Sequence, residues 1–141
     1  MTDQELNRVR DLRQRIRDLE RHLQALRLSV ENLVPVIDGL PHSHEVSRRV
    51  EKLAVKIVDA EQELDQLREE MLRAKSELVN IITGKVEDPT LQTLLILRYV
   101  SCCTFKETAR RMRFTLRYIF KLHEKILKEF ISVHIATQSE S

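Results

Sequence analysis

Apolar residues recur along the first part of the chain at alternating steps of three and four. The first run is Val9, Leu12, Ile16, Leu19, Leu23, Leu26, Val30 and Leu33. The second run is Val46, Val50, Leu53, Ile57, Ala60, Leu64, Leu67, Met71, Ala74, Leu78 and Ile81. A heptad with apolar a and d positions predicts two long helices that pair through a narrow seam.

Residues at the ends of these runs predict where the helices start and stop. Thr2 and Glu5 match a capping box, and Ser43 is a candidate cap for the second helix. We expect Gly84 to close that helix in the left-handed conformation. Between the runs, residues 34–42 (VPVIDGLPH) contain Pro35, Asp38-Gly39 and Pro41 and predict a turn rather than a helix. Residues 1–84 are therefore expected to form an antiparallel coiled-coil hairpin.

Charges beside the seam favour the hairpin without excluding a dimer. In a hairpin folded about residues 41–42, one side pairs Arg8 with Glu77, Arg15 with Glu70 and His22 with Glu63. The other side brings Arg13 to Arg68 and Glu20 to Glu61, which repel. This mismatch leaves room for a second hairpin. The second helix alone also suits a parallel dimer, through Lys56–Glu61, Glu63–Arg68 and Glu70–Lys75. A stalk that merely spaces another domain remains a further alternative.

The last third of the chain predicts three shorter helices. Asp88-Pro89 is a helix start, followed by a leucine-rich stretch that ends at Arg98-Tyr99-Val100. Thr104 to Glu107 is a second capping box, which opens a short helix to about Met112. After a turn around Arg113-Phe114, Thr115 caps a longer helix. Small or apolar residues are expected where these helices pack, namely Ala109, Met112, Phe114, Ile119, Leu122 and Ile126.

This stretch, LQTLLILRYVSCCTFKETARRMRFTLRYIFKLHEKILKEF, resembles region 4 of the sigma-70 type sigma factors. The match comprises the helix ending in LRY, the short Thr-x-x-Glu-x-Ala helix and the Thr-capped helix after it. A coiled coil before such a unit is similar to the ArpU-like regulators of phages and prophages of Gram-positive bacteria. The chain departs from the family in having Arg113 where the turn usually carries Gly, and in lacking the other sigma regions.

The resemblance implies a DNA-binding transcriptional regulator that reads the major groove with the helix around residues 115–130. Because recognition helices present their N-terminal residues to base edges, the expected base contacts are Leu116, Arg117, Phe120 and Lys121. Side chains around this face suit phosphates: Arg98, Thr104, Lys106, Arg110, Arg111, Arg113, Thr115 and Tyr118. Packing of Tyr118 and Phe120 against the stalk or a partner is the alternative for these two rings.

Charge distribution agrees with a polyanionic partner. Residues 1–83 carry 14 Lys/Arg and 16 Asp/Glu, whereas residues 84–131 carry 10 Lys/Arg and 5 Asp/Glu. The near-neutral total of +2 therefore conceals a basic C-terminal third. With 2 Gly and 3 Pro in 141 residues, an all-β fold is excluded and an all-α fold is expected.

Other chemistry is poorly represented. Cys102 and Cys103 lack zinc-ligand spacing and are expected to pack at a helix end, with redox sensing as the alternative. His42 and His44 have no third ligand nearby, and His123 is expected at the surface. With no nucleophile or phosphate-loop motif, we expect no enzyme, no metal and no cofactor. The absence of an apolar span or leader predicts a cytoplasmic protein without membrane contact.

We expect three parts: the hairpin over residues 1–84, a helix-turn-helix domain over 85–134 and a flexible tail over 135–141. The predicted function is a phage or prophage type regulator that binds double-stranded DNA. The hairpin would serve homodimerisation or contact with RNA polymerase. The alternative is a non-enzymatic interaction module, an adaptor or inhibitor that acts through the hairpin.

Overall fold

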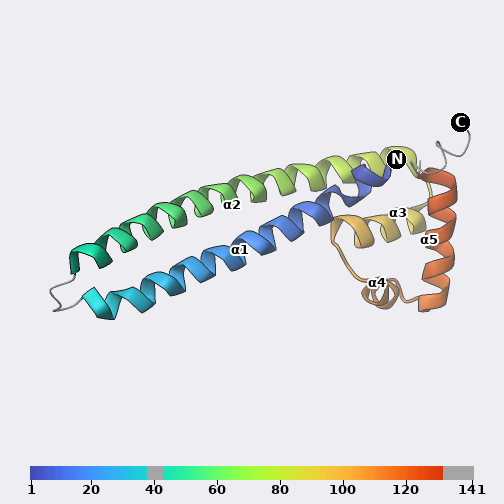
Figure 1. The fold of residues 1–141 in the computed structure, drawn as a ribbon. Coiled ribbons are helices and arrows are strands. Elements are labelled where there is room, and N and C mark those ends of the chain that lie inside the picture. Colours follow the sequence, from blue (N-terminus) through green and yellow to red (C-terminus); the bar gives the residue numbers. More distant parts are fainter. Residues whose placement is uncertain (38–42, 132–141) are drawn as a thin grey trace, which may run out of the picture. The chain divides into compact units, whose positions relative to one another are not determined.

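Every regular element in the described part of the chain is a helix, which confirms the predicted all-α class. The computed structural model describes residues 1–37 and 43–131, with the backbone alone at residues 34–37 and 43. Helix α1 spans Asp3–Ile37 and α2 spans Ser43–Lys85. Four shorter elements follow in the described residues: α3 (Pro89–Leu95), the π-helix η1 (Ile96–Val100), α4 (Phe105–Met112) and α5 (Leu116–Phe130). Figure 1 labels the α-helices.

The chain divides into two compact units. The hairpin unit is Arg13–Glu70, so it contains most of α1 and the first part of α2. The terminal unit combines Met1–Leu12 with Met71–Ser141, so the start of α1 and the end of α2 belong with α3 to α5. The predicted division at residue 84 lies inside the terminal unit, and residues 132–141, which include the expected tail, lie outside the described residues.

The hairpin unit is held by the predicted heptad seam. Its buried members are Ile16, Leu23, Leu26, Ala60, Leu64 and Leu67. The seam residues between these and residues 38–42 are half-buried, among them Val30, Leu53 and Ile57. Each leucine removed from water contributes roughly 1.5–3 kcal/mol, so this seam is the main source of stability for the unit.

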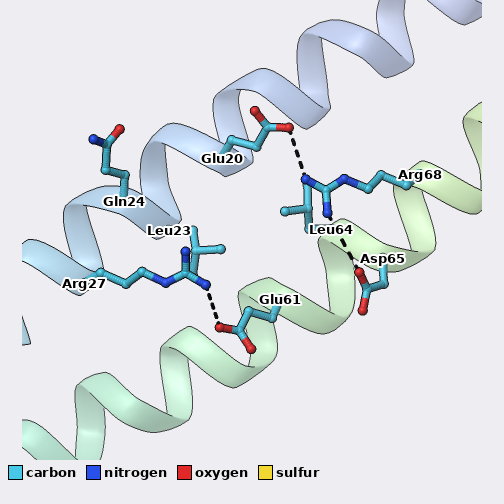
Figure 2. Close-up of a pocket in the computed structure, with 8 residues that line it drawn as sticks. All are labelled: Glu20, Leu23, Gln24, Arg27, Glu61, Leu64, Asp65 and Arg68. Atoms are coloured by element: carbon cyan, nitrogen blue, oxygen red, sulfur yellow. Dashed lines mark hydrogen bonds and ion pairs between the residues drawn. The ribbon is translucent and has the colours of Figure 1, made fainter.

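Ion pairs on one side of the seam differ from the prediction. Arg27 Nη2 lies 2.8 Å from Glu61 Oε1, and Arg68 Nη2 lies 3.4 Å from Glu20 Oε1. Both pairs join α1 to α2 on the same side of the hairpin, as Figure 2 shows. Glu61 and Arg68 each pair with an opposite charge on α1 that lies one heptad further along than the residue of like charge expected beside it.

The predicted ends of the long helices need two corrections. Helix α1 continues to Ile37, so the turn expected from residue 34 is wrong for residues 34–37. Pro35 lacks a backbone N–H, but it lies only two residues before the end of α1, so the disturbance is confined to the last turn. Residues 38–42 lie outside the described residues. Gly84 stays helical and α2 ends at Lys85, where the Val86 N–H donates to the Ile82 carbonyl at 2.9 Å.

The terminal unit has a continuous apolar core. Its most deeply buried side chains are Leu6, Val9, Leu78, Ile82, Val86, Leu94, Leu95, Ile119 and Ile126. The seam prediction placed Ile81 in this core, but Ile81 is half-buried and Ile82 is fully buried. Spacing of four from Leu78 to Ile82 to Val86 keeps one face of a 3.6-residue helix. Within this unit the predicted Arg8–Glu77 pair joins α1 to α2 at 2.9 Å.

The predicted caps of α1 and α3 are confirmed, whereas the Ser43 side chain, the candidate cap of α2, lies outside the described side chains. The Glu5 N–H donates to Thr2 Oγ1 at 3.1 Å, and the Thr2 N–H donates to Glu5 Oε2 at 3.2 Å. Asp88 Oδ1 accepts from the Thr90 N–H at 2.9 Å and starts α3. Both α3 and α4 contact α5, and η1 contacts α4. These contacts fix which face of α5 turns inward.

Candidate nucleic-acid interface

Helices α4 and α5 are joined by a short turn, Arg113 to Thr115. Arg113 takes the left-handed conformation, with φ 60° and ψ 39°. Its N–H donates to the Arg110 carbonyl at 3.3 Å, and the Phe114 N–H donates to the Ala109 carbonyl at 3.0 Å. These two bonds form a Schellman cap, a motif in which glycine is the usual left-handed residue. Arg113 therefore makes the turn without the glycine that is usual at this position.

Threonine side chains define both helix starts beside this turn. The Glu107 N–H donates to Thr104 Oγ1, and the Tyr118 N–H donates to Thr115 Oγ1, each at 3.1 Å. Thr108 is fully buried, and its hydroxyl donates to the Thr104 carbonyl at 2.8 Å. Because these bonds are local, the residues at which α4 and α5 begin follow directly from the sequence.

Of the six residues expected on the inner faces of α4 and α5, three are buried, Met112 and Leu122 are half-buried, and Phe114 is exposed. Ala109 is buried on α4, and Ile119 and Ile126 are fully buried on α5. Phe114 was expected in this apolar set but is exposed, and its ring meets Tyr118 edge-on at 4.9 Å between centroids. The left-handed cap places Phe114 beyond the last turn of α4, which is why helical spacing did not locate it.

All four predicted base-contact side chains lie on the solvent-exposed part of α5. Leu116 and Phe120 are 41% and 45% exposed, and Arg117 and Lys121 are exposed as well. Arg117 and Lys121 are four residues apart and share one face. The Phe120 ring also packs on Phe105 at 5.0 Å, so one side of this aromatic ring is supported from α4.

Most of the side chains predicted to contact phosphates are exposed. Seven of them are exposed: Thr104, Lys106, Arg110, Arg111, Arg113, Thr115 and Tyr118. Lys106 and Arg110 lie one turn apart on α4 and line a surface hollow together with Thr104 and Glu107. Arg111 also donates to Cys103 Sγ at 3.4 Å, which holds one end of its guanidinium near the start of α4.

Arg98 is placed differently from the other cations. It is half-buried, and its Nη1 donates to the Cys103 carbonyl at 2.9 Å. The guanidinium lies over the Phe105 ring at 4.3 Å, and its Nε has no hydrogen-bond partner among the described residues. Burial, and then the nearby charge of Arg10, lower the pKa of Arg98. Its phosphate contact stays a prediction, and the contacts show that Arg98 also braces the loop before α4.

An aromatic cluster behind the exposed face was missed in the sequence. Tyr99 Oη and His123 Nε2 are 2.6 Å apart, and Phe105 meets the His123 ring edge-on. Burial, and then the charge of Arg98, lower the pKa of His123, and burial raises the pKa of Tyr99. The expectation that His123 lies at the surface is wrong. Its spacing from Ile119 and Ile126 was the signal, since steps of four and three keep the inner face.

In the described part of the chain, the cysteine and histidine side chains form neither a disulfide nor a metal-ligating cluster. Cys103 is buried and Cys102 is half-buried with φ 55°, and neither forms a disulfide. His44 is exposed on α2, and His42 lies outside the described residues. Within residues 1–37 and 43–131 no cluster of three or more metal-ligating side chains occurs. None of the described helices has the length and apolar character needed to cross a bilayer.

Comparison of the chain with protein-family models, with curated proteins and with solved structures finds no match. The geometry of α4 and α5 and the charges that they carry are therefore the basis for assigning a function.

Proposed function

We propose that this chain is a DNA-binding transcriptional regulator that reads the major groove with the first half of α5. The observation that carries the proposal is the basic, exposed face at the start of α5. Its inner side is fixed by Ile119 and Ile126, which are fully buried, so Arg117 and Lys121 are held outward. A helix presented in this way fits the major groove of B-form DNA.

Electrostatics support a nucleic-acid partner. Residues 104–121 carry six Lys/Arg and one Asp/Glu. Positive charge of this density attracts a polyanion from a distance and releases counterions when it neutralises phosphates. The second half of α5 contains Glu124 and Glu129, so the attraction is concentrated on α4, the turn and the start of α5.

Each part of the face has a distinct role in the proposal. Arg117 grips guanine O6 and N7, Lys121 reaches the same edge, and Leu116 and Phe120 contact thymine methyl groups. Lys106 and the other cations on α4 and the turn bind phosphates, which position the protein without specifying sequence. Double-stranded DNA in a bacterial cytoplasm is the proposed target. The resemblance to sigma region 4 and to phage regulators adds RNA polymerase as a candidate contact.

A pair of variants tests base reading against phosphate binding. Preferred DNA is first selected from a random pool, and affinity is then measured by fluorescence anisotropy on preferred and scrambled duplexes at several salt concentrations. Arg117→Ala should lose about 1–3 kcal/mol on preferred DNA and relax the preference at one position. Lys106→Ala should weaken both duplexes alike and reduce the salt slope by about one.

The matched control is Arg21→Ala, which removes one exposed cation from α1 in the hairpin unit. This change should leave both affinity and salt slope unchanged. Equal, sequence-independent losses from Arg117→Ala and Lys106→Ala would mean that Arg117 does not read bases.

An interaction module acting through the hairpin is the second candidate function. The observation that favours it is Leu28 of α1 in the hairpin unit, which is 50% exposed. If folded protein binds no DNA at low salt, this candidate replaces the DNA-binding proposal.

A further inference from the structure

The outer face of α2 in the hairpin unit carries an unpaired apolar patch. The a and d residues Ala60, Leu64 and Leu67 are buried in the seam. On a different face of the same helix, Val55 and Val58 are 61% and 50% exposed. Residues three apart are neighbours on a helix surface, so the two valines form one patch.

Charge along this part of α2 changes sign at the patch. Residues 43–56 carry four Lys/Arg and two Asp/Glu, a net charge of +2. Residues 57–70 carry one Lys/Arg and six Asp/Glu, a net charge of −5. The net charge changes sign between Val55 and Val58. Residues 43–70 of α2 therefore have a basic first half and an acidic second half, with the two exposed valines at the boundary.

From this arrangement we infer that a second copy of the chain packs its α2 antiparallel against this face. A two-fold axis passes between Val55 and Val58, so Val55 of each copy faces Val58 of the other. In this register Arg48 faces the second copy's Asp65, and His44 faces its Glu69. Every contact occurs twice, as a closed two-fold interface requires.

Arg48 and Asp65 are both available for this pairing. Arg48 is exposed, and the Asp65 side chain is 78% exposed and reaches Arg68 only at 4.0 Å. A parallel pairing would instead place the acidic halves together and the basic halves together. The valines then supply the apolar contact, while the charges select the orientation and the register.

The inference concerns self-association and stands independently of DNA binding. Its test uses the full chain in sedimentation equilibrium, with circular dichroism to confirm that each variant keeps its helix content. The wild-type chain should dimerise. Arg48→Asp places Asp opposite Asp65, and Asp65→Arg places Arg opposite Arg48, so each variant alone should weaken dimerisation at least about tenfold.

Mixing the two variants is the decisive measurement. In a heterodimer of the Arg48→Asp and Asp65→Arg chains, both facing pairs become opposite in sign again. An equimolar mixture should therefore dimerise at least about tenfold more tightly than either variant alone. Arg21→Asp, an equal charge change at an exposed position of α1, is the matched control and should dimerise like the wild type.

Three results would overturn the inference: a monomeric wild-type chain, variants that dimerise like Arg21→Asp, or a mixture that stays as weak as its components. Val58→Asp provides an independent measurement, because it places a charge at the two-fold axis and should abolish the dimer. An unchanged dimer in this variant would also contradict the inference.

Discussion

The left-handed residue in the α4–α5 turn predicts that glycine is more stabilising than alanine at this position, the reverse of their order inside a helix. Arg113 has φ 60°, where an L-residue is disfavoured by roughly 1–2 kcal/mol because its Cβ crowds the backbone. Glycine removes this strain but gives the unfolded chain more freedom, which offsets about 0.4–1 kcal/mol of the gain. Arg113→Gly should therefore be more stable than Arg113→Ala by about 1 kcal/mol, because alanine keeps the Cβ.

Comparing glycine with alanine, rather than with arginine, isolates the backbone. Both variants remove the same exposed cation, so differences in charge cancel. Arg110 provides the control, since it is exposed but lies inside α4 with helical backbone. There the order should reverse, with Arg110→Ala more stable than Arg110→Gly by about 1 kcal/mol.

Urea and thermal unfolding followed by circular dichroism measure these differences. A gain of 1 kcal/mol corresponds to an increase in Tm of about 4 °C for a domain of this size. If Arg113→Gly is no more stable than Arg113→Ala while the Arg110 pair behaves as expected, the turn is not left-handed in solution. If both positions prefer alanine equally, the stated role of Arg113 in the cap is wrong.

Three further predictions concern the two cores. Leu64→Asp buries an unpaired charge in the hairpin seam and should lower the free energy of unfolding by several kcal/mol; unchanged melting would contradict the seam assignment. Ile82→Ala should destabilise by about 2–5 kcal/mol, and Ile81→Ala by clearly less; equal losses in urea titrations would contradict the four-residue spacing at the end of α2. The pKa of His123 is lowered from its ordinary 6.5, so the unfolded state binds more protons and stability falls as pH drops below about 6.5. His123→Gln should lose less stability between pH 7 and pH 5, and an identical pH profile would show that His123 does not contribute.

Local signals predicted the helix starts correctly. A cap needs only a side chain and a backbone N–H a few residues away, so Thr2, Asp88, Thr104 and Thr115 identified their helices without knowledge of the fold. Heptad spacing identified the hairpin seam for a similar reason. In the hairpin unit each long helix packs against one partner helix, so the apolar repeat alone predicts which side chains are buried. The predicted exposed residues of α5 followed once its inner face was known.

The burial of a side chain that packs against several elements could not be predicted in the same way. The end of α2 lies in the terminal unit with four shorter elements, so the face it buries differs from the strict seam and includes Ile82. Arg98 was expected to contact phosphate and His123 to lie at the surface, but both side chains are half-buried. Their burial depends on the Tyr99 and Phe105 rings, which come from elsewhere in the unit.

The Arg27–Glu61 and Glu20–Arg68 ion pairs of the hairpin have a consequence for misfolding. A seam that repeats every seven residues buries similar apolar surface if one helix slides by a heptad, so hydrophobicity alone leaves a competing alignment. Sliding one way would replace the observed pairs by Arg13 against Arg68 and Glu20 against Glu61, and sliding the other way would bring Arg27 to Arg68. Each pair is worth only a few tenths of a kcal/mol, but the change from attraction to repulsion raises the energy of both slipped states. These surface charges thus select one alignment from several that the apolar residues would accept.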